Sequence, residues 1–276
     1  MARDARELRG AWTTFQRHWY GVPAADLSPF VSGYWAAEWD LRGQEPYRQK
    51  IVPYPNVHLS FRDGGAVVRG PERGHVVRTL EGRSAVFGVT FRPGCFRPFL
   101  GASVSTITGR SLPAAAVFGP DLPGAIPQMA AAVFGPDRPA VIAGVADAPA
   151  VALVVEEFLR ARRPEPDPLA EQAALIVARI QAEPHLTRVD ALAGAAGLGV
   201  RRLQRLFAEY VGLGPKWVIR RYRLHEVGER LASGADIDWA GLATELGYAD
   251  QAHFIRDFTA MVGESPTRYA ERYPRR

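Results

Sequence analysis

The chain has 276 residues, of which 47% are hydrophobic and 23% are charged, and its formal net charge is +5. This length and composition predict two domains, each able to bury a core, and exclude a disordered chain. The single cysteine excludes an internal disulfide, the charged N-terminus is unlike a secretory signal, and the longest apolar run, 140–155, is too short to cross a membrane. We therefore expect a cytoplasmic protein with no membrane span.

Short β-rich runs separated by turn residues occupy the chain between Leu27 and Arg92. The separators include Pro53, Gly65 and Gly82, and such residues fix φ or allow it to be positive in turns. This pattern predicts a small, mostly antiparallel β domain. The expected strands are 30–39, 49–52, 57–61, 66–68, 75–80 and 84–91.

The sequence pattern changes near residue 161, and this change predicts the domain boundary. Before it we expect helices at 95–100, 128–134 and 140–160, and three prolines in 162–168 then indicate an extended, semi-rigid connector. The predicted organisation is a β-rich domain at 1–160, a linker at 161–168 and a helical domain at 169–276. The expected helices of the last part are 169–181, 188–196, 200–210, 215–232, 239–246, 250–261 and 266–272.

An internal repeat lies in the helical part. The residues LA followed by GL at 192–198 recur 50 positions later as LA followed by GY at 242–248, and beyond the turn Phe207 and Pro215 match Phe258 and Pro266 with an offset of 51. Self-similarity of this kind indicates one supersecondary unit used twice.

Each unit consists of a short helix, a turn containing glycine and a second helix with apolar residues three and four apart, which is typical of a helix-turn-helix. We expect Thr187 and Asp190 to form a capping box, Asp238 to cap the equivalent helix, and Gly197 and Gly247 to end the first helices in the left-handed conformation. The fold class is therefore α+β: a small antiparallel β-rich N-terminal domain with flanking helices, and an all-α domain of two helix-turn-helix units joined by a long helix.

Basic charge is concentrated in and after the first of these second helices. Between 201 and 223 there are seven basic residues and one acidic residue, Glu209, so this stretch alone exceeds the net charge of the chain. Arg and Gln match the edges of guanine and adenine in the major groove, and basic side chains neutralise phosphate. The cluster predicts a double-stranded DNA partner, although a merely solvated helix face remains the alternative. The basic residues are Arg201, Arg202, Arg205, Lys216, Arg220, Arg221 and Arg223.

These motifs resemble the DNA-binding domain of AraC/XylS-type transcription regulators. The matching stretches are LAGAAGL at 192–198, RRLQRLF at 201–207 and ELGYADQAHFIRDF at 245–258, followed by Gly263, Pro266 and Tyr269 at the family spacing. The resemblance implies a transcription regulator whose two recognition helices, joined by the helix 215–232, enter successive major-groove segments.

The resemblance and the charge pattern together give the candidate DNA contacts. Gly199 replaces the serine that often caps the first recognition helix in the family, and Ala252 and Ile255 offer no hydrogen bond, so the second helix is expected to read fewer bases. The base-contact candidates are Arg201, Gln204, Arg205, Gln251, Ala252, His253 and Arg256. The phosphate-contact candidates are Arg202, Lys216, Arg220 and Arg221.

The N-terminal domain is less specific in sequence. In the AraC/XylS family this region commonly binds a small effector or dimerises, and the run GVTFRPG at 88–94 resembles one subgroup of the family. Aromatic residues line apolar pockets but also fill ordinary β cores, so both interpretations stay open. The expected partners besides DNA are a small-molecule effector, a second copy of the chain and RNA polymerase. The effector-pocket candidates are Trp35, Tyr54, His58, Phe61, Phe87 and Phe91.

An enzymatic alternative depends on Cys95. At a predicted helix start its pKa could be lowered, which would make it a nucleophile or redox sensor, whereas the other interpretation is a small buried hydrophobe. An alkyl-transfer repair protein needs a zinc-held set of thiolates, which one cysteine cannot supply, and the sequence has no glycine-rich phosphate loop and no H-E-x-x-H pair. We therefore expect no enzyme activity, catalytic residue, metal site or cofactor.

Overall fold

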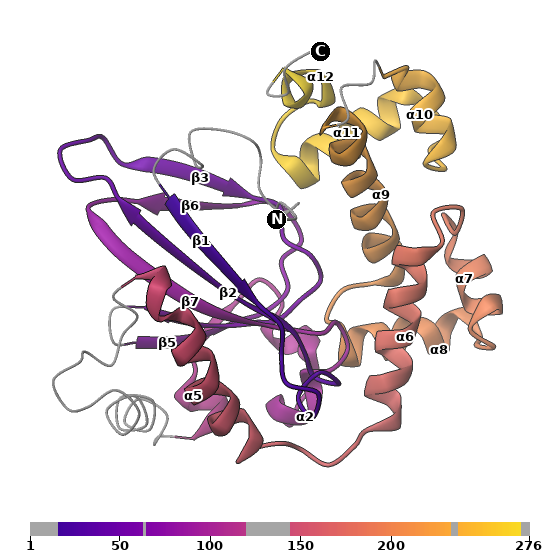
Figure 1. The fold of residues 1–276 in the computed structure, drawn as a ribbon. Coiled ribbons are helices and arrows are strands. Elements are labelled where there is room, and N and C mark those ends of the chain that lie inside the picture. The colour runs from indigo at the N-terminus through magenta and orange to yellow at the C-terminus, as the bar shows by residue number, and fades with distance from the viewer. Residues whose placement is uncertain (1–15, 63–64, 120–143, 233–236, 272–276) are drawn as a thin grey trace, which may run out of the picture.

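The computed structural model describes residues 16–62, 65–119, 144–232 and 237–271, in which a β-rich region and a group of helices lie side by side (Figure 1). All paired strands are antiparallel. A six-stranded sheet has the order β1 (Gln16–Gly21), β2 (Val31–Asp40), β7 (Arg83–Phe91), β4 (His58–Arg62), β5 (Gly65–Arg69) and β8 (Ser111–Pro113). A two-stranded sheet pairs β3 (Tyr47–Ile51) with β6 (Val76–Leu80).

The six expected strands are confirmed, with their ends within two residues of the predicted ones. The sequence did not predict β1 and β8. Strand β8 has three residues and ends in Pro113, which lacks an amide donor, and it pairs only at the sheet edge with β5. Strand β1 has three polar residues followed by the adjacent aromatics Trp19 and Tyr20, so its sequence shows no clear alternation.

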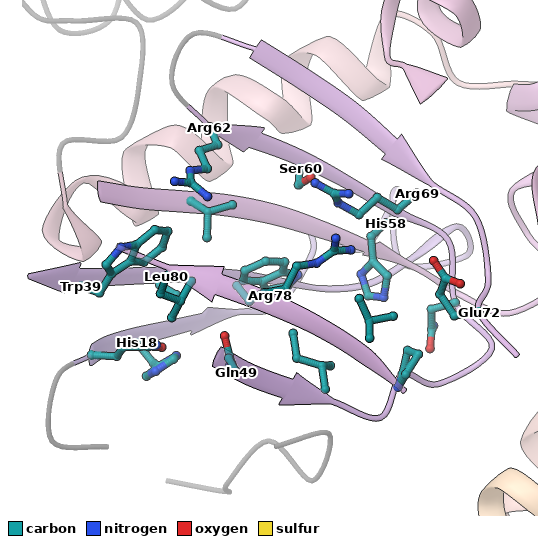
Figure 2. Close-up of a pocket in the computed structure, with 18 of the residues that line it drawn as sticks. His18, Trp39, Gln49, His58, Ser60, Arg62, Arg69, Glu72, Arg78 and Leu80 are labelled. Carbon is teal, nitrogen blue, oxygen red and sulfur yellow. The ribbon is translucent and has the colours of Figure 1, made fainter. Parts of the chain in front are cut away.

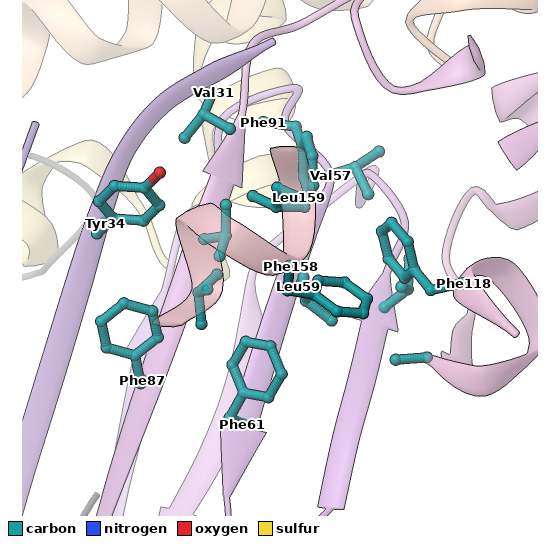
Figure 3. Close-up of a cluster of buried hydrophobic side chains, with 14 of the residues drawn as sticks. Val31, Tyr34, Val57, Leu59, Phe61, Phe87, Phe91, Phe118, Phe158 and Leu159 are labelled. Atoms are coloured by element: carbon teal, nitrogen blue, oxygen red, sulfur yellow. The ribbon is translucent and has the colours of Figure 1, made fainter. Parts of the chain in front are cut away.

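The main core lies on one face of the large sheet. Because side chains alternate along a strand, Leu59 and Phe61 of β4 point to the same face as Phe87, Val89 and Phe91 of β7. Helix α5 (Ala148–Arg160) packs on this face through the buried Phe158 and Leu159 (Figure 3). The opposite face is left to face β3 and β6.

The helices follow the predicted order. Short helical segments precede the C-terminal group: α2 (Arg97–Leu100), η1 (Val104–Ile107), α3 (Ala115–Phe118) and η2 (Val145–Asp147). The C-terminal helices are α6 (Pro168–Ala182), α7 (Val189–Ala195), α8 (Val200–Tyr210), α9 (Pro215–Ala232), α10 (Trp239–Glu245), α11 (Gln251–Val262) and α12 (Pro266–Ala270). The predicted helix at 128–134 and the start of the one at 140–160 lie outside the described residues.

The turns and caps of the two helix-turn-helix units are largely as expected. Gly197 and Gly247 have φ values of 66° and 79°, and Asp238 Oδ1 accepts a hydrogen bond from the Ala240 amide at 3.1 Å. The capping box at Thr187 is wrong, because Arg188 is the residue before α7 and its side chain pairs with Asp190 at 2.7 Å.

The turn after α8 touches the β-rich region closely at Gly212. Thr108 Oγ1 donates a hydrogen bond to the Gly212 carbonyl at 2.7 Å, and Gly212 has a φ of +79°. A Cβ atom there would lie 2.9 Å from Pro71, Val104 and Thr108 atoms. Both the backbone conformation and the contact therefore require glycine.

Gly212→Ala is expected to lower the free energy of unfolding by about 2 kcal/mol or more, because it adds left-handed strain to overpacking. The control is Gly194→Ala, in α7, where an added Cβ meets nothing within 4 Å and should stabilise the helix by about 0.5–1 kcal/mol. Urea unfolding of both variants measures the two effects. Equal changes in the two variants would show that the Gly212 contact is not tight.

Candidate nucleic-acid interface and β-domain pocket

Helix α8 exposes a basic face with hydrogen-bonding side chains and buries the opposite, apolar face. Its apolar side is buried through Leu203 and Phe207, which pack with α6 and α7 residues. The opposite side exposes Arg201, Gln204 and Arg205 together, with Arg202 beside them. Helix spacing of three and four residues brings the first three onto one strip. Gly199 precedes the helix in an extended conformation with no side-chain cap, as its lack of a side chain requires.

Helix α11 is anchored more firmly and exposes less charge. Asp250 Oδ1 caps it by accepting a hydrogen bond from the His253 amide at 2.7 Å. Phe254 and Phe258 are buried, whereas Gln251, Ala252 and Arg256 are exposed. Ile255 is also 37% exposed, so this helix presents an apolar side chain beside its polar ones.

A polar cluster joins α9 to α11. Arg220 Nη1 lies 2.7 Å from Asp257 Oδ2, and Arg220 Nη2 lies 3.2 Å from His253 Nε2. The His253 ring also packs edge-on against Tyr248. Arg220 and His253 are therefore half-buried and held by neighbours within the protein, while Lys216 at the start of α9 is exposed.

Two basic residues of the charge cluster do not lie on the surface. Arg221 is 2% exposed and donates to the backbone carbonyls of Pro53 at 2.8 Å and Val52 at 2.7 Å, both in the β-rich region. Arg223 is 1% exposed and donates to the Ile180 and Glu183 carbonyls. Consecutive helix positions point about 100° apart, so a charge count along α9 mixes buried and exposed arginines. Arg221 is thus corrected from a phosphate candidate to a contact between the two regions.

A cavity of about 190 Å³ lies between the large sheet and the β3–β6 pair (Figure 2). Of the six effector-pocket candidates, the structure brings Trp35 and His58 to its wall. His58 Nδ1 is also within hydrogen-bond distance of Thr90 Oγ1, at 3.2 Å. Trp35 packs tightly over Gly88, where a Cβ would lie 2.2 Å from its ring.

The other four candidates need correction. Phe61, Phe87 and Phe91 alternate to the opposite face and belong to the core beneath α5. Tyr54 lies against the C-terminal helices, where its ring is 5.4 Å from that of Tyr222 and the Arg221 guanidinium lies 4.2 Å above it. Alternation within the predicted strands could have separated the two faces. It could not have shown which face was closed by a second sheet.

The pocket also contains charged residues that sequence reasoning missed. They come from β4, β5, β6 and the connection between the last two: Arg62, Arg69, Arg78 and Glu72. The signal for Arg78 is the alternation of Val76, Arg78 and Leu80 on β6, which places one basic side chain between two apolar ones on the same face.

Cys95 does not have the environment of a reactive thiol. It is 4% exposed, and burial raises the pKa of its thiol to about 11. A nucleophilic or redox-sensing cysteine needs an accessible thiolate near neutral pH. The buried-hydrophobe interpretation of Cys95 fits this environment, and the lowered pKa does not.

Two helix-turn-helix units, the first with a basic second helix, are typical of a DNA-binding protein, and comparison with known proteins agrees. Residues 192–272 match the family model of a helix-turn-helix domain, and this part of the chain is a helix-turn-helix domain of the AraC type. The protein is accordingly a DNA-binding transcription regulator. Residues 21–113 match the model of a domain of unknown function (DUF6597).

Solved structures similar to this chain include the C-terminal domain of AraT, a response regulator from Geobacillus stearothermophilus, at 20% identity and a TM-score of 0.34 over 38% of this chain and 88% of that one. A transcriptional regulator from Chromobacterium violaceum matches at 22% identity and a TM-score of 0.31, over 38% of this chain and 90% of that one. ToxT from Vibrio cholerae matches at 10% identity and a TM-score of 0.40, over 94% of this chain and 98% of that one. Within the described residues, no helix has the length and apolarity that crossing a bilayer requires.

Arg221→Gln is expected to lower the free energy of unfolding by about 2–3 kcal/mol, because it breaks buried hydrogen bonds of a charged group. The matched control, Arg202→Gln, removes an exposed arginine and should change stability by less than about 0.5 kcal/mol. On random DNA, Arg202→Gln should reduce the salt dependence of binding and Arg221→Gln should not, when both are assayed below the unfolding transition. If Arg221→Gln reduced the salt dependence of binding and left the stability unchanged, Arg221 would be a phosphate contact after all.

The Cys95 thiol should react slowly with a disulfide reagent at pH 8 in the folded protein and quickly after unfolding in urea. A pKa of about 11 leaves roughly a hundredth of the thiolate that an ordinary cysteine of pKa about 9 would have. Absorbance of the released thiol follows the reaction. Equal rates in the two states would contradict the buried environment.

Proposed function

We propose that this chain is a cytoplasmic, sequence-specific regulator whose helices α8 and α11 read successive major-groove segments of one DNA site. The observation that carries the proposal is the exposed strip of Arg201, Gln204 and Arg205 on α8, in a helix-turn-helix unit whose other face is buried. Arginine binds guanine and glutamine binds adenine through paired hydrogen bonds. In this proposal 169–276 binds DNA, 1–160 is the controlling domain and 161–168 links them.

The proposed contacts divide by exposure. On α11, Gln251 and Arg256 reach base edges, Ala252 contacts a thymine methyl group, and His253 contributes less because it is already held by Arg220. Arg202 and Lys216 neutralise phosphates, and Arg220 supports α11 through Asp257.

We also propose that a small effector controls DNA binding through the pocket of the β-rich region. The supporting observation is that the strand wall of the pocket also holds the C-terminal helices. Gln49 and Ile51 line the pocket, whereas the intervening Lys50 lies 3.5 Å from Glu264 and the next carbonyls, of Val52 and Pro53, bind Arg221. A ligand that moves β3 would therefore change how α9 packs against the β-rich region.

The alternative, an N-terminal domain that only dimerises, gives no reason for a cavity between the sheets. A second copy of the chain and RNA polymerase remain proposed partners. A homodimer would place further recognition helices on the DNA, and contact with polymerase is the means by which such a regulator would act on transcription.

Arg205→Ala is expected to weaken binding to the cognate site by about ten- to a hundredfold and binding to random DNA far less, because a base contact is lost. The control, Lys216→Ala, should weaken both alike and lower the salt slope by about one. Fluorescence anisotropy on a site found by genome-wide mapping measures both. Equal losses on the two DNAs for Arg205→Ala would show that it contacts phosphate only.

A further inference from the structure

Alternate residues of the strands around the β-domain pocket face into it. On β2, Trp35 and Trp39 face the pocket, and on β6, Val76 and Leu80 do so (Figure 2). With Ile51 and Val86 these residues make most of the wall apolar. The pocket is thus suited to an apolar body of small size.

The charged residues of the pocket are unbalanced. Three arginines, Arg62, Arg69 and Arg78, line it with one carboxylate, Glu72. Figure 2 shows Arg69 and Glu72 toward the same end as His58, with Arg78 reaching between that end and Leu80. Arg62 lies over the Trp39 ring at 4.9 Å, nearer the other end.

Arg69 and Arg78 both line the pocket, and among the described residues neither has a carboxylate within 4 Å. Arg69 Nη1 donates to Ser111 Oγ at 3.2 Å, and among the described residues the Arg78 guanidinium has neither a hydrogen bond nor a carboxylate within 4 Å. Burial lowers the pKa of both guanidinium groups and the charge of Arg78 lowers that of Arg69 further, whereas the Glu72 carboxylate acts in the opposite direction on both. Two half-buried cations that share one carboxylate, Glu72, leave an excess of positive charge at the cavity, which a bound anion would neutralise.

We propose that this pocket binds a small molecule with an apolar body and one carboxylate, and that Arg69 and Arg78 hold the carboxylate. The inference rests on the proposed effector role of the pocket and specifies the ligand. A guanidinium fork matches the two oxygens of a carboxylate, and the bond is strengthened where water is excluded. A cationic ligand would be repelled by the same pair, and a neutral one would leave Glu72 as the one lining carboxylate to offset their charges.

Repulsion between Arg69 and Arg78 destabilises the protein when no ligand is bound. Removing Arg78 relieves the repulsion on Arg69 and breaks no hydrogen bond within the described part of the chain. Arg78→Gln is therefore expected to fold with an unchanged or raised Tm in the absence of ligand. The variant tests binding without the ambiguity of a misfolded protein.

The test is calorimetric titration of the full chain, without DNA, with phenylacetate, indole-3-acetate and hexanoate, and with the primary amide of each. At least one acid should bind at submillimolar Kd and raise the Tm, and its amide should bind at least about tenfold more weakly. Arg69→Gln and Arg78→Gln should each weaken the acid at least about tenfold and leave the amide unchanged. The control is Arg48→Gln, on the exposed face of β3, which should leave both affinities unchanged.

Three outcomes would overturn the inference: no acid binding at millimolar concentration, equal binding of acid and amide, or equal weakening by Arg48→Gln and Arg78→Gln. Tighter binding of phenyl phosphate than of phenylacetate would also overturn it in favour of a phosphate ester. None of these results bears on sequence-specific DNA binding, because the titration contains no DNA. Failure of the regulator proposal is registered separately by the anisotropy of the Arg205→Ala variant.

Discussion

The buried guanidinium of Arg221 fixes how the two halves of the molecule meet. A charge removed from water must find several hydrogen-bond acceptors, and Arg221 finds them in the backbone carbonyls of Val52 and Pro53, with the Tyr54 ring stacked above it. Backbone carbonyls cannot turn away as a side chain can. The segment after β3 is therefore held to α9 in one position, and the neighbouring contacts, such as Trp217 Nε1 to the Arg73 carbonyl at 2.9 Å, form around it.

The period-two alternation of the β strands connects this contact to the pocket. On β4 and β7 one set of side chains fills the core beneath α5, and the other set faces the cavity. On β3 the cavity set, Gln49 and Ile51, alternates with Lys50, which reaches Glu264 beyond α11. The same short strand is thus one wall of the pocket and one side of the domain contact. In the proposed effector control, a ligand that displaces β3 would therefore act directly on α9 through the Val52 and Pro53 carbonyls.

The sequence predicted local structure well and three-dimensional neighbours poorly. The bounds of α8 and α9 agree with the structure because the apolar spacing, Gly199 and Pro215 are all local signals. The fate of Arg220, Arg221 and Arg223 could not be predicted from α9 alone. They point to α11, to the β-rich region and to α6 respectively, and only the packing of those elements decides which arginine is buried. Phe61, Phe87 and Phe91 were misplaced for the same reason, since a strand pattern separates two faces without saying which one a second sheet will cover.

The two helix-turn-helix units share an architecture but not an electrostatic state. In the first unit the arginines of α8 project from a helix whose only acidic residue, Glu209, pairs with Arg97 at 2.6 Å outside the unit. In the second, Asp257 and His253 hold Arg220 against α11, and Ile255 is exposed between the polar positions. Charges already paired within a protein gain little from a phosphate or a base, because their partners must be given up first. In the proposed complex with DNA, we therefore expect the first unit to supply most of the hydrogen-bonded base contacts, and the second to add an apolar contact about one helical turn away along the DNA.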